Sequence, residues 1–158
     1  MDGSEAGGPP GAPERMRLLA ERSGLRRLQI LTMRAPDDPQ RGGAEEHAEQ
    51  VARHWAGAGV HVQLRAAAVP GRPAVSEEHG VHVVRRGGAA TVFPRGALAA
   101  RFERDGAWDG LLEVSHGLPF WAPRWTGKPS VLFVHHVLQG VWHLQAAGAA
   151  TARVGAVL

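Results

Sequence analysis

The sequence has no cysteine and no tyrosine, and only one of its 18 basic residues is a lysine. Without cysteine the chain has no disulfide, no thiolate nucleophile and no cysteine-based zinc site. It also lacks any run of the roughly 18 apolar residues that a membrane-spanning helix needs. The first residues, MDGSEAGGPPGAPER, lack the apolar core of a signal peptide, so the cytoplasm is the default location.

Several familiar functional patterns are missing as well. The net charge is only +3, and the arginines are scattered rather than clustered with aromatic residues, so nucleic-acid binding is not indicated. There is no G-x-S-x-G and no H-E-x-x-H, which leaves a hydrolase or metalloprotease without support. A dinucleotide fingerprint and a P-loop are also absent.

What is present fits one globular domain. The 158 residues are 44% hydrophobic and 21% charged, an ordinary balance for such a domain. Residues 1–24 predict a disordered leader, since 1–13 are mostly Gly, Pro and Ala without periodicity. Residues 14–27 are basic and weakly helical; we favour an exposed lead-in and keep peripheral contact with a membrane surface as the alternative.

Strands and helices alternate over residues 25–158. The apolar run 28–33 predicts a buried strand, and apolar residues at spacings of three and four after Gly43 predict a helix that ends at the glycines of 57–59. Further strands are expected at 60–65 (a more peripheral one, from its alternating pattern), 81–86, 109–114 and 130–136, with helices at 93–107 and 137–158 and loops at 66–80 and 115–129. This order predicts an α/β, Rossmann-like, doubly wound and mostly parallel sheet. The apolar ending VGAVL suggests a domain truncated at its C-terminal end.

A glycine pair, Gly42-Gly43, lies between the first strand and the first helix. Ligands of such sheets bind at the carboxyl ends of the strands, and the N–H groups of a helix N-terminus suit phosphate. Glycines would let a ligand approach the backbone closely, although a tight turn with positive φ is the simpler explanation. Glu45 and Glu46 follow in the first helical turn, where they favour the helix dipole, or where one of them faces a sugar hydroxyl or an acceptor molecule.

Histidines and a carboxylate follow two other strands. His135 and His136 end an apolar strand, and adjacent strand residues point to opposite faces, so we expect one imidazole to face the cleft. The pair is therefore not expected to hold one metal ion. Glu113 ends the strand at 109–114 and His116 follows it, and both could bind hydroxyls or accept a proton. The other histidines, at 47, 54, 61, 79 and 82, are expected to be solvent-exposed.

These motifs, in this order, resemble the N-terminal domain of family 4 glycosyltransferases with the GT-B fold. The matching stretches are P-x₅-GGAE from Pro36 to Glu45, GAGVHVQL at 57–64, GVHVVRRG at 80–87 and DGLLEVSHGLPFWAP…PSVLFVHHVLQGVW at 109–142. Such enzymes have two Rossmann-like domains across a cleft, and the N-terminal one mainly binds the acceptor.

The resemblance implies roles for individual residues. Gly42 and Gly43 would approach the donor diphosphate, and His135 would be the catalytic histidine near the sugar. Glu45, Glu113, His116 and His136 would bind a carbohydrate or lipid-linked acceptor. The nucleotide-sugar would be a co-substrate, with no further cofactor and no metal.

The sequence departs from this family in lacking the donor-binding domain and its E-x₇-E motif. We therefore expect the acceptor half of a glycosyltransferase, inactive unless another domain or chain binds the donor. The alternative is a non-catalytic α/β binding or interaction module. An oxidoreductase or methyltransferase is disfavoured, because the second strand ends in RAAA and carries no acidic residue there.

Overall fold

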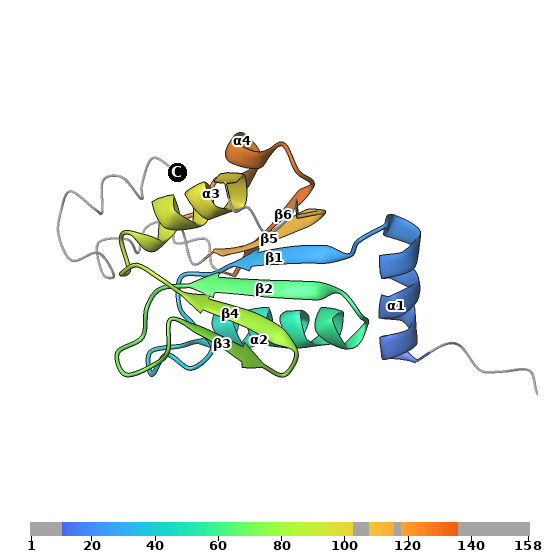
Figure 1. The fold of residues 1–158 in the computed structure, drawn as a ribbon, viewed down its shortest axis with the longest axis horizontal. Helices are drawn as coiled ribbons and strands as arrows, with labels where there is room; N and C mark the ends of the chain where they lie inside the picture. Colours follow the sequence, from blue (N-terminus) through green and yellow to red (C-terminus); the bar gives the residue numbers. More distant parts are fainter. Residues whose placement is uncertain (1–10, 103–107, 116–117, 136–158) are drawn as a thin grey trace, which may run out of the picture.

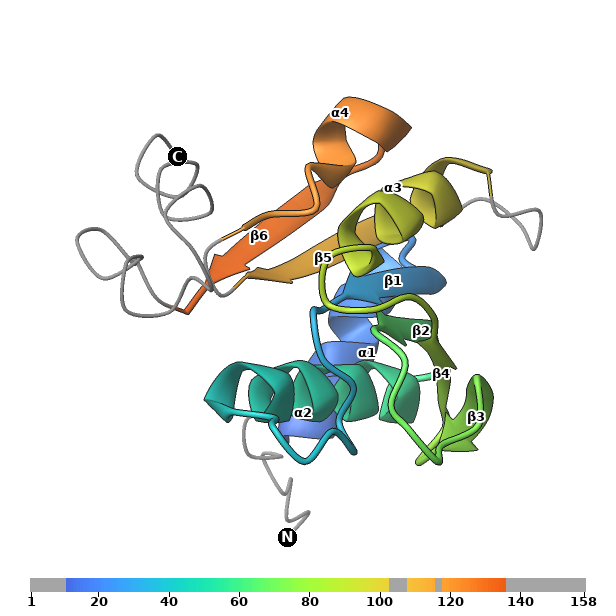
Figure 2. The same cartoon turned by 90° about the vertical axis from the view of Figure 1, so that its left-hand side faces the viewer.

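The chain forms a six-stranded sheet with helices on both faces (Figures 1 and 2). The computed structural model describes residues 11–102, 108–115 and 118–135. Its elements are α1 (Ala12–Ser23), β1 (Arg27–Leu31), α2 (Gly43–Gly57), β2 (His61–Ala66), β3 (Val75–Glu78), β4 (Val81–Arg85), α3 (Val92–Phe102), β5 (Gly110–Ser115), α4 (Ala122–Thr126) and β6 (Ser130–Val134).

The strand order is β3-β4-β2-β1-β5-β6, and every pairing except β3 with β4 is parallel. The chain winds from β1 through β2 to β4 on one side and then returns to β5 and β6 on the other. This change of direction lies between β1 and β5, with α2 and α3 on opposite faces of the sheet (Figure 2). The predicted doubly wound, mostly parallel α/β fold is confirmed.

The helix predicted after Gly43 is α2, and its apolar stripe covers one face of the sheet. Ala44, Ala48 and Ala52 are buried against the strands, with Val51 and Trp55 partly buried at the margin. Because the buried side chains are single methyl groups, the helix axis can lie close to the sheet. Burial of this stripe, rather than helix propensity, holds α2 in place.

The second strand is not peripheral, as its alternating pattern suggested, but lies in the middle of the sheet between β1 and β4. Its polar residue Gln63 is 4% exposed. The side-chain amide of Gln29 on β1 donates a hydrogen bond of 2.9 Å to the side-chain oxygen of Gln63. A polar residue can therefore occupy a buried strand, since its partner is in the neighbouring strand.

The other face of the sheet is covered by α3 and α4. Val92 and Ala97 of α3 pack with Leu31, Leu111 and Phe120 in a second core. A Cβ on Gly96 would lie only 2.8 Å from the Phe120 ring, so glycine permits this helix to contact the loop before α4. The predicted helix at 93–107 is confirmed as far as Phe102, and residues 103–107 lie outside the described part of the chain.

Part of the loop predicted at 66–80 forms a strand. β3 pairs with β4 as an antiparallel hairpin whose two turn residues, His79 and Gly80, have φ of 52° and 78°. Two turn residues with positive φ match the twist of the paired strands. The hairpin was missed because the turn contains His79 in place of the usual Asn or Asp.

The apolar strand at 130–136 is β6, and it lies at one edge of the described sheet beside β5. Its apolar residues are exposed despite their character, for example Val131 at 57% and Phe133 at 42%. Continuous apolar sequence indicated a strand correctly, but it does not distinguish a central strand from an edge strand.

Helix α1 (Ala12–Ser23) agrees with the weak helical pattern of residues 14–27, and it differs from the disordered leader predicted for 1–24. Pro13 lies in its first turn, and Gly24 ends it in the left-handed conformation with φ of 68°. Ala20 and the following Leu25 anchor this helix to the core that α2 covers. Residues 1–10 of the predicted leader and the predicted helix at 137–158 lie outside the described residues.

Candidate functional site

The candidate site lies at the carboxyl edge of the parallel strands. The first turn of α2 follows β1 at this edge, which Figure 2 faces. Glu113 lies in the second half of β5, and His135 directly follows β6. Parallel α/β sheets bind ligands here, near the point where the strand order reverses.

Gly42 and Gly43 need no special backbone conformation. Gly42 has φ of −125° and ψ of −167°, which is extended backbone, and neither glycine has a positive φ. A Cβ on Gly43 would meet no atom within 4 Å, and one on Gly42 would only touch Glu45 at 3.6 Å. The simpler explanation, a tight turn with positive φ, is therefore wrong. The two glycines leave the start of α2 open to close approach.

Glu45 does not face this open side, because its side chain turns back on the helix. The residue is fully buried, and Oε2 accepts a hydrogen bond of 2.8 Å from the Gly42 backbone N–H. Its carboxylate thus satisfies a donor that the helix itself leaves unpaired. This placement differs from the expected contact of Glu45 with an acceptor.

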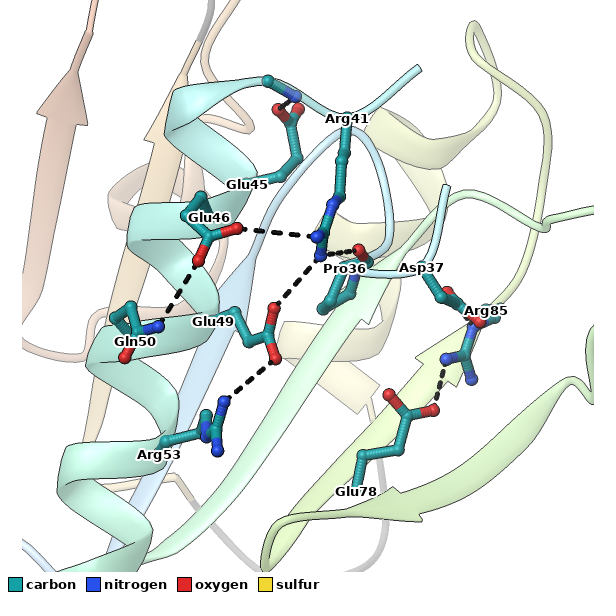
Figure 3. A network of polar contacts seen from close by, with 11 residues as sticks. Pro36, Asp37, Arg41, Glu45, Glu46, Glu49, Gln50, Arg53, Glu78 and Arg85 are labelled. Atoms are coloured by element: carbon teal, nitrogen blue, oxygen red, sulfur yellow. Dashed lines mark hydrogen bonds and ion pairs between the residues drawn. The ribbon is translucent and has the colours of Figure 1, made fainter. Parts of the chain in front are cut away.

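Arg41, at the end of the loop before α2, ties that loop to the helix (Figure 3). Its guanidinium donates to the Pro36 carbonyl at 2.6 Å, and it lies 3.4 Å from a carboxylate oxygen of Glu49 and 3.7 Å from one of Glu46. A single exposed ion pair contributes little to stability, but several contacts on one guanidinium restrict the motion of the loop that precedes Gly42.

A second network holds the same loop against the β3–β4 hairpin (Figure 3). The Arg85 side chain, 1% exposed, donates to Asp37 at 2.9 Å and to Ser76 at 2.7 Å, and it also pairs with Glu78. Burial raises the pKa of the Glu78 carboxyl, but hydrogen bonds from Ser76 and Arg85 and the charge of Arg85 outweigh burial and lower this pKa below 4.5. The loop is therefore held at both ends before α2 begins.

The structure brings His135 to α2, where His47 meets it. Nδ1 of His47 lies 3.1 Å from Nε2 of His135, a hydrogen-bond distance whose donor depends on the tautomers. The Phe133 ring packs edge-on against His47 with centroids 4.8 Å apart. An imidazole held in this way keeps a fixed orientation and can donate, accept or move a proton.

His47 was expected to be solvent-exposed, so sequence reasoning missed it. It lies four residues after Gly43 and therefore above the first turn on the same side of α2. That spacing alone could have predicted that His47 lies beside the start of α2. Its partner lies 88 residues away on another element, and no local pattern reports such a contact.

Glu113 is enclosed by the loop that follows β5. It is 2% exposed, and its two carboxylate oxygens accept backbone N–H groups of Phe120 at 2.8 Å and Ala122 at 2.6 Å. These bonds fix the aromatic loop and the start of α4, a position that differs from the expected contact with an acceptor. His116 and His136, the other two expected acceptor residues, lie outside the described residues.

Two further properties bear on the chemistry. Over residues 11–102, 108–115 and 118–135, no three His, Asp or Glu side chains converge in a way that could hold a metal ion. Within the same residues, no helix combines the length and apolar character needed to cross a bilayer.

Comparison with known proteins adds no further constraint. The chain matches no model of a protein family, no curated protein and no solved structure.

Proposed function

We propose that this chain is the acceptor-binding half of a glycosyltransferase with the GT-B architecture. In this proposal the open start of α2 at Gly42-Gly43 faces the diphosphate of a nucleotide-sugar, and His135 lies near the transferred sugar. A second domain or a separate chain binds the rest of the donor. The alternative, a non-catalytic α/β binding module, is favoured by one observation: the buried Glu45 carboxylate accepts a backbone N–H and the buried Glu113 carboxylate accepts two.

The observation that carries the proposal is the open glycine pair at the start of α2. Neither backbone conformation nor packing requires glycine at 42 or 43, which leaves access to the helix N-terminus as the reason for a missing side chain. Glu45 occupies the Gly42 N–H, so the following N–H groups of the first turn and the helix dipole are what favour a diphosphate there. Such groups would stabilise the charge that develops on the departing diphosphate.

The His47–His135 contact supports the second part of the proposal. It brings the imidazole of His135 from β6 to the first turns of α2, the same helix end that the diphosphate would meet. His47 then acts as a positioning residue, since its ring fixes how the His135 ring is oriented. A proton donor or acceptor at this place suits transfer of a sugar between two oxygen atoms.

The test uses the full chain and UDP-glucose and GDP-mannose as probes. We expect no turnover by the chain alone, and backbone amide shifts in NMR spectra on titration, centred on residues 42–44. Gly43→Ala should abolish these shifts. The matched control Gly57→Ala, at the other end of α2 where a Cβ also meets nothing within 4 Å, should keep them.

Two outcomes would count against the proposal. Robust turnover by the isolated chain would contradict a half enzyme. Absence of shifts with both probes, together with no carbohydrate binding by calorimetry, would favour the non-catalytic module. Folding of Gly43→Ala is checked by its circular dichroism, and among the residues that the structure describes a Cβ at this position would meet no atom within 4 Å.

A further inference from the structure

We propose that helices α3 and α4 form a docking face for a membrane surface that contains anionic lipids. These two helices lie on the side of the sheet opposite α2 (Figure 2). The α3–α4 face consists of Leu98, Arg101, Phe102, Trp121, Arg124 and Trp125. It is separate from the glycine pair of α2, and docking there does not depend on sugar transfer.

Four large apolar side chains of the α3–α4 face are exposed. They are Leu98 at 57%, Phe102 at 63%, Trp121 at 44% and Trp125 at 48%. Both helices bury a different side in the core, α3 through Val92 and Ala97 and α4 through Ala122. Single exposed apolar residues are common on protein surfaces, but a contiguous group of large ones indicates an interaction surface.

Contacts between the two helices bring these residues together. The Arg101 guanidinium donates to the Trp125 carbonyl at 3.0 Å, and it lies over the Phe102 ring, 5.2 Å from its centre. Leu98 precedes Phe102 by four residues on α3, and Trp121 precedes Trp125 by the same spacing at the start of α4. Because residues four apart lie on the same side of a helix, the four apolar side chains form one surface.

The charge of this surface has one sign. Neither α3 nor α4 contains an aspartate or a glutamate, and Arg101 and Arg124 are both exposed. An arginine can lay its apolar stem along neighbouring rings while its guanidinium reaches outward. Basic side chains beside apolar ones are therefore complementary to anionic lipid headgroups above an acyl layer.

Tryptophan is also suited to this boundary. An indole ring has a large apolar body and one N–H donor, and it is enriched where membranes meet water. A second copy of the chain fits less well. In a symmetric dimer through this face, Arg101 and Arg124 of both copies would meet, and the two helices provide no carboxylate to pair with them.

The experiment measures co-sedimentation of the full chain with vesicles of mixed phosphatidylglycerol and phosphatidylcholine, and with vesicles of phosphatidylcholine alone. We expect binding to the mixed vesicles and much weaker binding to phosphatidylcholine. The variant Arg124→Gln/Trp125→Ser should bind the mixed vesicles about tenfold more weakly. One basic side chain near an anionic surface accounts for roughly fivefold, and loss of the indole adds to it.

The matched control is Leu19→Ser/Arg22→Gln on α1. It also removes one exposed apolar side chain and one exposed arginine, since Leu19 is 54% exposed. It lies within residues 14–27, where the sequence left peripheral membrane contact as the alternative. We expect this control to bind like the unmodified chain. A further variant, Phe102→Ser, alters the same face from α3 and should weaken binding even though it leaves α4 unchanged.

Three outcomes would overturn the proposal. They are no binding of the unmodified chain to the mixed vesicles, equal binding by the α4 variant and the α1 control, and unchanged binding by Phe102→Ser. Size-exclusion chromatography adds a fourth: a dimer of the unmodified chain that the α4 variant loses, without vesicle binding, would show that a second copy covers this face. None of these results affects the Gly43→Ala test at α2.

Discussion

Substitution of Glu113 tests whether its carboxylate holds the loop that follows β5. The substitution Glu113→Gln keeps the size of the side chain and one acceptor oxygen. The new NH₂ group, however, must face one of the two backbone N–H groups, of Phe120 or Ala122, that the carboxylate accepts at 2.8 and 2.6 Å. One buried donor is then left without an acceptor, and a second donor points at it.

The cost follows from the burial of the site. A hydrogen bond to a buried charged group contributes about 1.5–3 kcal/mol, and a buried donor left unpaired costs about 1–3 kcal/mol. The two ranges describe the same lost hydrogen bond and are not added together. Glu113→Gln should therefore lower the free energy of unfolding by about 2–3 kcal/mol. Glu113→Ala loses both bonds and should cost more. The control Glu14→Gln, on the exposed face of α1, should change stability by less than about 0.5 kcal/mol.

Two measurements check this. Urea unfolding gives the free energy of unfolding of each variant, and hydrogen exchange gives the protection of the Phe120 and Ala122 amides, which should fall selectively in Glu113→Gln. If Glu113→Gln is as stable as the Glu14→Gln control and both amides stay protected, the carboxylate does not hold this loop. Contact with an acceptor would then be its better explanation.

Three further predictions concern the networks and packing around the site. Arg85→Met should lower the free energy of unfolding, measured in urea, by about 2–3 kcal/mol. This loss is smaller than for a fully buried ion pair, because the carboxylate partners of Arg85 are partly exposed. The control Arg53→Met breaks an exposed ion pair and should cost under about 1 kcal/mol. The pKa of Glu78 is lower in the folded chain, so the stability that this carboxylate contributes is present above pH 4.5 and is lost as the pH falls through its folded pKa. Between about pH 7 and pH 3, the free energy of unfolding should therefore fall less in Glu78→Gln than in the unmodified chain. Equal losses in the two proteins would contradict this role of Glu78. Gly96→Ala should destabilise the fold by about 1–3 kcal/mol, because the Phe120 ring lies 2.8 Å from where its Cβ would be. Gly57→Ala, the control, should be neutral or slightly stabilising. Thermal unfolding distinguishes the two variants, and a neutral Gly96→Ala would show that the ring can move aside.

Local pattern was sufficient for most elements of the fold. Elements that depend on residues close together in the chain could be predicted from the sequence. These are the apolar runs of β1 and β6, the alanine stripe of α2 and the glycines after it. The hairpin of β3 and β4 was not, because its turn uses His79 in a conformation that this residue type rarely adopts.

Strand position was decided by pairing and not by composition. The pattern of β2 looked peripheral because Gln63 and Arg65 alternate with apolar residues, yet Gln29 on β1 satisfies Gln63 inside the sheet. The run that forms β6 is continuously apolar, yet this strand lies at an edge of the described sheet. Which neighbour a strand finds depends on contacts that are distant in sequence.

For this protein the sequence by itself determined the α/β class, the alternation of strands and helices, and the place of Gly42-Gly43 at the start of a helix, because each depends on residues close together in the chain. Only the tertiary structure decided that His47 meets His135 and that Glu45 and Glu113 turn to backbone N–H groups. These depend on distance in space between separate elements, and that distance is fixed by packing of the whole domain rather than by any local pattern.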